Sequence, residues 1–170
     1  MTKKIDSDIG LAIIGCGTIG RIRAKFARDY PGIGWLGLCD IDESLGRELA
    51  EEVGADFFTT DFEELIVRPE VQATMIITDE NRHTEPTLKA VDQGHKLFIE
   101  KPLATEARES KQILDAITAD GLDACIETPE KHFNDGMHRG KCKFRRIDFV
   151  WKKPNQFLNF IGIKFFSSLK

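Results

Sequence analysis

Three closely spaced glycines constrain the fold of this chain more than any other feature of its sequence. Gly15, Gly17 and Gly20 lie where an apolar run at residues 11–16 gives way to a segment with helical spacing. In a strand–turn–helix unit, Gly15 would permit the tight turn, Gly17 would let a phosphate approach the backbone, and Gly20 would let helix and strand pack closely. The helix N-terminus would offer free N–H groups to the anion. The G-x-G-x-x-G pattern therefore predicts a pyrophosphate site, with a glycine-rich turn of some other α/β protein as the alternative.

The rest of the first 127 residues alternates between strand-like and helix-like segments. Short apolar runs, which are typical of buried parallel strands, occur at residues 11–16, 33–39, 55–60, 71–78, 96–100 and 122–126. Apolar residues at helical spacing lie between these runs, and the third helix is expected to be short. Strict alternation favours the α/β class, with a doubly wound parallel sheet and helices on both faces. We expect this domain to occupy residues 1–127.

Several local signals give specific expectations about the helices. Four apolar residues at spacings of three, four and four predict the apolar face of the first helix: Ile19, Ile22, Phe26 and Tyr30. Gly54 is predicted to cap the C-terminus of the second helix. Thr105 is predicted to cap the N-terminus of the last helix, which Gly121 would end.

An aspartate follows the second strand at the position expected of the acid that binds the ribose in such domains. Asp40 comes 20 residues after Gly20, in agreement with the usual spacing of about 20 residues. A carboxylate there would accept hydrogen bonds from the ribose hydroxyls and repel a 2′-phosphate, so the sequence predicts NAD in preference to NADP. Asp42 and Glu43 compete for this role, and an exposed strand-end aspartate is the alternative.

A lysine and a glutamate end the fifth predicted strand, in the sequence Glu100-Lys101-Pro102. Ligands of open α/β sheets bind beyond the carboxyl ends of the strands. Lys101 at that position could orient a substrate hydroxyl or help to move its proton. A solvated strand-end lysine is the alternative interpretation.

Four motifs occur together in one order, and together they resemble the Gfo/Idh/MocA family of NAD(P)-dependent oxidoreductases. They are residues 15–20, 39–42, 78–83 and 100–104, with sequences GCGTIG, CDID, TDENRH and EKPLA. The resemblance runs from about residue 9 to residue 126. It implies hydride transfer between a nicotinamide and a sugar- or polyol-type hydroxyl.

The resemblance also implies roles for individual residues. Thr18 and Ile19 would give backbone contacts to the pyrophosphate. Lys101 would be the catalytic residue, with Glu100 beside it at the junction with the substrate. The nicotinamide side would be lined by Thr78, Asn81 and His83. The family's usual T-P-N-x-x-H has Asp79 and Glu80 in place of its Pro-Asn pair here, which leaves the roles of residues 79–81 open.

The last forty residues differ in character from the rest. Residues 1–130 contain 14 Lys and Arg against 26 Asp and Glu, a net charge of −12, whereas residues 131–170 contain 10 against 2, a net of +8. Residues 128–170 are therefore expected to form an atypical basic, Phe-rich tail where the family has a second domain. A frameshift or premature end and a genuine short extension are the two main interpretations. We expect neither a metal site formed by His132, His138 and Cys142, which lack a fourth ligand and the usual spacing, nor a nucleic-acid contact.

The missing second domain leaves two functional hypotheses. The first is the oxidoreductase, and the second is a non-catalytic nucleotide-binding module or truncated remnant. A methyltransferase with a similar glycine loop is a third class, which the Glu100-Lys101-Pro102 motif disfavours. The four cysteines form no C-x-x-C pair, and the sequence has no predicted signal peptide or membrane span, so we expect free thiols in the cytoplasm. Neither the oligomeric state nor the individual substrate follows from the sequence.

Overall fold

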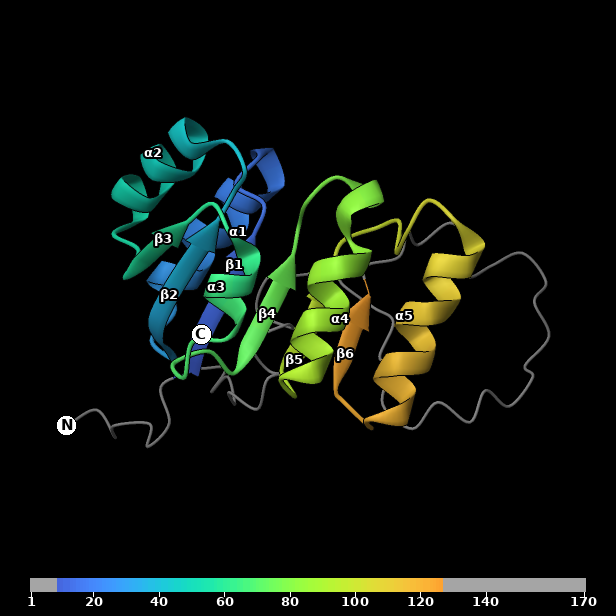
Figure 1. Cartoon of the computed structure of the whole chain (residues 1–170). Coiled ribbons are helices and arrows are strands. Elements are labelled where there is room, and N and C mark those ends of the chain that lie inside the picture. Colours follow the sequence, from blue (N-terminus) through green and yellow to red (C-terminus); the bar gives the residue numbers. More distant parts are fainter. Residues whose placement is uncertain (1–8, 127–170) are drawn as a thin grey trace, which may run out of the picture.

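Six short apolar segments form the strands of one parallel sheet in the computed structural model, which describes residues 9–126 (Figure 1). The strands are β1 (Ile9–Ile14), β2 (Ile33–Cys39), β3 (Phe57–Thr59), β4 (Ala73–Ile76), β5 (Lys96–Ile99) and β6 (Ala124–Ile126). Their order in the sheet is β3-β2-β1-β4-β5-β6, and every neighbouring pair is parallel. This is the strand order of the dinucleotide-binding doubly wound fold, so the predicted fold class is confirmed.

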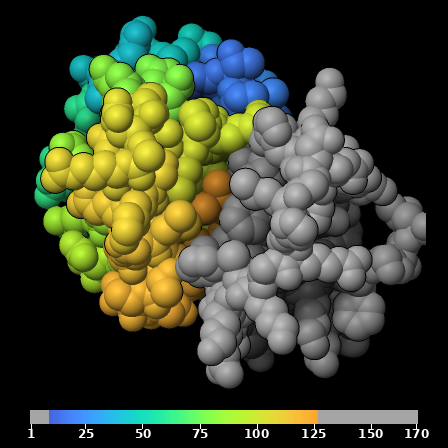
Figure 2. Space-filling model, turned by 90° about the vertical axis from the view of Figure 1, so that its right-hand side faces the viewer, coloured from blue at the N-terminus to red at the C-terminus, as the bar shows by residue number. Residues whose placement is uncertain are grey.

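Helices cover both faces of the sheet. They are α1 (Thr18–Asp29), α2 (Glu43–Val53), α3 (Phe62–Ile66), α4 (Thr84–Asp92) and α5 (Ala107–Ala119), with a 3₁₀ turn, η1 (Glu80–Arg82), before α4. Residues of α1 and α2 belong to one core cluster, and residues of α3, α4 and α5 belong to the other. In Figure 1 the helices α3, α4 and α5 lie in front of the sheet. Figure 2 shows the β6 edge, where α5 and its flanking segments form the yellow to orange surface.

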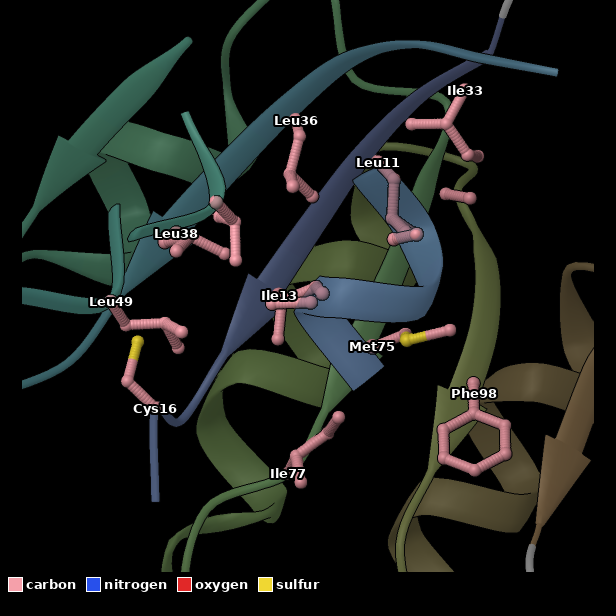
Figure 3. Packing of buried hydrophobic residues seen from close by; sticks show 14 of the residues in the cluster. Leu11, Ile13, Cys16, Ile33, Leu36, Leu38, Leu49, Met75, Ile77 and Phe98 are labelled. Carbon is pink, nitrogen blue, oxygen red and sulfur yellow. The ribbon is translucent and has the colours of Figure 1, made fainter. Parts of the chain in front are cut away.

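The hydrophobic core is divided by the sheet into two layers. Alternate residues of β1 point to opposite faces, as expected of a strand: Leu11 and Ile13 enter the first cluster, and Ala12 and Ile14 enter the second. Figure 3 shows the first cluster, with Cys16 close to Leu49 of α2. Because both layers are filled, the functional groups can only gather at the ends of the strands.

The apolar face predicted for α1 is not the face that packs on the sheet. Ile19, Ile22 and Phe26 are 46%, 47% and 50% exposed, whereas the buried residues of α1 are Gly20, Ala24 and Ala27. These small residues repeat at the same helical period and let the helix backbone approach the strands closely. The helix itself was predicted correctly, but its buried side was wrong, because close packing selected the stripe of smaller residues.

The predicted helix caps have mixed outcomes. Gly54 ends α2 in the left-handed conformation at φ 63°, which confirms it as the C-cap. The N-cap of α5 is Glu106, and its side chain makes no capping hydrogen bond, so the prediction of Thr105 was wrong. Three of the four cysteines lie in the described residues, and all three are buried free thiols.

Some predictions fall outside the described residues. The tail at 128–170, including His132, His138 and Cys142, is among them. Within residues 9–126, no helix has the length and apolar character needed to cross a membrane.

Candidate functional site

A cleft of about 1170 Å³ lies beyond the carboxyl ends of the central strands. Its walls come from the segments that follow β1, β2, β4 and β5, together with the first turns of α1, α4 and α5. The chain leaves β1 toward one side of the sheet and β4 toward the other, so the two strand ends diverge. This divergence is the place where open α/β sheets bind their ligands.

The three glycines of the loop after β1 are required for three different reasons. Gly15 has φ 102°, and a Cβ there would collide with the carbonyl group of Ile77. A Cβ on Gly20 would collide with the carbonyl of Gly15. A Cβ on Gly17 would meet no protein atom within 4 Å, because Gly17 faces the cleft. Two glycines therefore shape the loop, and Gly17 leaves free space where a ligand can approach the backbone.

Asp40 is tied to the glycine loop by its side chain. Its Oδ2 accepts a hydrogen bond of 2.7 Å from the Cys16 N–H, and its Oδ1 accepts one of 2.9 Å from the Asp42 N–H. The two competitors have other partners: Asp42 accepts from the Leu45 N–H as the N-cap of α2, and Glu43 pairs with Arg47 at 2.6 Å. Asp40 thus places a fixed carboxylate on the cleft wall beside the loop.

The segment after β4, where residues depart from the family motif, forms a short hydrogen-bonded turn. Asp79 has φ −62°, which is close to the value that a proline fixes. Its carbonyl accepts a hydrogen bond of 2.9 Å from the Arg82 N–H, which closes the η1 turn. Thr78, Asp79 and Asn81 all line the cleft. Asp79 can therefore stand at the usual proline position without altering the turn.

The end of β5 carries an ion pair to α1. Arg23 Nη2 donates to Glu100 Oε1 at 3.0 Å, and the two side chains are only 18% and 10% exposed. The Arg23 guanidinium also lies over the Phe98 ring, 5.0 Å from its centroid. Lys101 is exposed on the cleft wall and has no ion-pair partner among residues 9–126. The Lys101 amine is thus available to a ligand while its neighbour is held in place.

Two of the predicted site residues do not line the cleft. Gly20 is buried against the Gly15 carbonyl. His83 is 1% exposed, with Nε2 3.0 Å from the Thr78 carbonyl oxygen and Nδ1 3.3 Å from the Leu103 carbonyl oxygen. Both ring nitrogens therefore face protein atoms. The other nine predicted residues line the cleft: Gly15, Gly17, Thr18, Ile19, Asp40, Thr78, Asn81, Glu100 and Lys101.

The cleft is also lined by residues that the sequence did not predict, among them Arg23, Ile41 and Thr84. Arg23 lies four residues after Ile19, on the same side of α1, and that spacing is the one signal that could have placed it on the cleft. Ile41 is 68% exposed on the wall next to Asp40. Thr84 lines the cleft with a buried Oγ1 that has no hydrogen-bond partner among the described residues, and no sequence signal marks it.

Two thiols beside the cleft are protonated and therefore unreactive. Burial is the main cause that raises the pKa of the Cys16 thiol to about 12, and the neighbouring Asp40 carboxylate is the second. Burial is also the main cause that raises the pKa of Cys39 to about 12. Both thiols stay protonated near neutral pH, so neither is a nucleophile in this site.

Comparisons with known proteins agree with this geometry. Residues 9–127 match the Gfo/Idh/MocA family, described as an oxidoreductase family with an NAD-binding Rossmann fold. An inositol 2-dehydrogenase of Gluconacetobacter diazotrophicus is 35% identical over 115 residues, which are 66% of this chain and 34% of that protein. A scyllo-inositol 2-dehydrogenase (NAD(+)) of Bacillus subtilis is 26% identical over 119 residues, or 69% of this chain and 35% of that protein. The chain spans about a third of the length of these relatives.

Solved structures show the same fold. A scyllo-inositol dehydrogenase from Lactobacillus casei, with bound NAD(H) and scyllo-inositol, superposes with a TM-score of 0.67 at 19% identity. The superposition covers 76% of this chain and 38% of that one.

Proposed function

The chain belongs to the Gfo/Idh/MocA family of oxidoreductases, and from this premise we propose that its cleft binds NAD for hydride exchange with a sugar- or polyol-type hydroxyl. One observation carries the proposal: the open glycine loop, the Asp40 carboxylate and the exposed Lys101 amine line a single cleft. These three groups would contact the phosphates and the ribose of the cofactor and the reacting oxygen of the substrate, respectively.

The residues around Gly17 fit a pyrophosphate. The space in front of Gly17 is free of protein atoms within 4 Å of a Cβ position, so phosphate oxygens can reach the backbone. The N–H groups of Thr18 and Ile19 lie in the first turn of α1, where unpaired donors and the helix dipole favour an anion. The nicotinamide, when bound, supplies the hydride acceptor.

Asp40 supports NAD over NADP. Its carboxylate is held by two N–H donors, and it would accept hydrogen bonds from the ribose hydroxyls through its remaining lone pairs. A 2′-phosphate at that place would meet this fixed negative charge. The described cleft residues from Cys39 to Leu45 include no basic side chain that could offset the repulsion. The exposed Ile41 would give the adenine an apolar contact on the same wall.

Lys101 is the proposed catalytic residue. In the oxidation direction the substrate carbon gives up a hydride, and its hydroxyl must lose a proton. The Lys101 amine would hydrogen-bond that oxygen and help to move the proton. Thr78 and Asn81 are proposed to line the nicotinamide side, since both line the cleft in the segment after β4, the strand next to β5. The buried free thiols support the expectation of a cytoplasmic location.

The first test is a fluorescence titration of the purified full chain with NADH and, separately, with NADPH. Saturable binding with NADH preferred is the expected result, and absence of binding to either would reject the proposal. Turnover is then measured with NAD and a panel of inositols and other polyols. Binding without turnover on any polyol would favour the alternative, a non-catalytic nucleotide-binding module. If turnover occurs, Lys101→Met should abolish it while the chain still binds NADH.

A further inference from the structure

We propose that Arg23 and His83 are positioning residues that hold the Lys101 segment, residues 100–103, from two sides. The inference rests on the proposed role of Lys101 and adds two residues that would act through the segment around it. Each of them contacts a different end of the segment: Arg23 lies on α1, on one face of the sheet, and His83 lies just before α4, which covers the other face.

The first attachment is the ion pair between Arg23 and Glu100. Glu100 immediately precedes Lys101, and its side chain is 10% exposed. A charge pair with so little solvent contact is stronger and more directional than a surface pair. The Arg23 side chain is itself fixed by its position over the Phe98 ring. The carboxylate of Glu100 is therefore held against α1, and with it the backbone that leads into Lys101.

The second attachment is the imidazole of His83. Its Nδ1 faces the carbonyl oxygen of Leu103, two residues after Lys101, and its Nε2 faces the carbonyl oxygen of Thr78. The ring can donate to either carbonyl, according to its tautomer. His83 is fixed in turn, because its own carbonyl accepts hydrogen bonds from both the side chain and the N–H of Thr87. The ring thus links the Lys101 segment to the cleft wall after β4.

The two attachments explain how an exposed lysine can act at a defined place. Lys101 has no ion-pair partner among residues 9–126, so its own side chain does not fix it. Among residues 9–126, residues 101–103 make no backbone–backbone hydrogen bond, whereas the Glu100 N–H donates to the Ile76 carbonyl at 3.0 Å. Reactive groups must be supported by their neighbours to within a fraction of an ångström. Arg23 and His83 are placed to give that support.

The test is hydrogen exchange, read by mass spectrometry on peptides that cover residues 100–104 of the full chain. The variants are Arg23→Gln and His83→Gln. The matched control for Arg23 is Arg21→Gln, on the same helix α1, which breaks exposed ion pairs to Glu48 and Glu52 of α2. The matched control for His83 is His95→Gln, which removes a buried imidazole bonded to Thr74. The amide to follow is that of Glu100, whose N–H donates to the Ile76 carbonyl, and its exchange is expected to rise by roughly tenfold in each test variant and not in the controls.

Rescue separates positioning from a general loss of stability. Arg23→Lys keeps a cation for Glu100 and should return exchange at residues 100–104 to within about threefold of the wild type. Glu100→Gln removes the carboxylate partner of the same ion pair and should raise exchange at the same amides. If His83→Gln does not fold, the Arg23 and Glu100 variants still decide the first attachment.

Two results would overturn the inference. One is unchanged exchange at 100–104 in Arg23→Gln, and the other is a rise that spreads equally over all strands. Failure of the proposed function gives a different signature, since the wild-type chain would then bind no NADH whatever the exchange pattern.

Discussion

The two halves of the sheet build their parts of the cleft by different means. On the β1–β3 side a glycine loop exposes its backbone, and the Asp40 carboxylate is held by two backbone N–H groups close to it in the fold. On the β4–β5 side, Glu100 after β5 is held by a side chain from the other half, because it pairs with Arg23 of α1, 77 residues away. The first half is thus suited to a ligand of constant shape, and the second half can change with the substrate without altering the fold.

The largest expected effect tests the backbone-built half. Gly15→Ala places a Cβ at φ 102° against the Ile77 carbonyl. The left-handed conformation costs about 1–2 kcal/mol and the overlap about 1–3 kcal/mol. We expect the free energy of unfolding in urea to fall by roughly 2–5 kcal/mol.

The control for this change is Gly54→Ala. Gly54 also has a positive φ, of 63°, but no atom lies within 4 Å of its Cβ position. It should lose only about 1–2 kcal/mol. Equal losses at both positions would show that the contact with Ile77 has no importance.

A second change in the same loop is expected to weaken cofactor binding without lowering stability. Gly17→Ala adds a methyl group that no protein atom opposes, so the free energy of unfolding should change by less than about 0.5 kcal/mol. The methyl group would occupy the space of a phosphate, so the Kd for NADH should rise tenfold or more, or about 1.4 kcal/mol. Unchanged NADH affinity would contradict the assignment of Gly17 to the pyrophosphate.

A third change concerns cofactor selection. Asp40→Asn removes the charge that would repel a 2′-phosphate, and the preference for NADH over NADPH should fall by about tenfold. The control is Asp42→Asn, because asparagine is an equally good N-cap for α2. Parallel titrations of both variants with the two cofactors check this. A loss of preference in the Asp42 variant alone would move the ribose role to Asp42.

The last expected effect is a dependence of stability on alkaline pH. The Cys16 and Cys39 thiols have pKa values of about 12 when folded, against 9.0 as the ordinary value. Their contribution is therefore complete below pH 9 and is lost as the pH rises from 9 to 12, because the unfolded chain gives up these protons first. By pH 10 the loss should be roughly 1 kcal/mol for each thiol.

Urea unfolding at pH 8 and pH 10 measures this loss. Alkylation by iodoacetamide at pH 9, with and without urea, provides the independent check. Rapid alkylation of either thiol in the folded chain would contradict the protonated, buried state.

The sequence alone determined the elements that depend on nearby residues. The strands and helices follow from hydrophobic periodicity, and β2 was predicted with its observed bounds of Ile33–Cys39. The glycine loop and Asp40 were found because a strand, a turn and a helix fix their spacing along the chain. Nine of the eleven predicted site residues line the cleft, and the positions of Thr78 and Asn81 among them came from the family resemblance.

Only the tertiary structure decided which of several possible contacts each side chain makes. Helix α1 carries two apolar stripes of equal period, and close packing buried Gly20, Ala24 and Ala27 rather than the larger residues. His83 turns inward because two carbonyl oxygens face its ring. Arg23 reaches Glu100 because β1 and β5 flank β4 in one sheet. Such contacts depend on distances in space, which spacing along the chain does not encode.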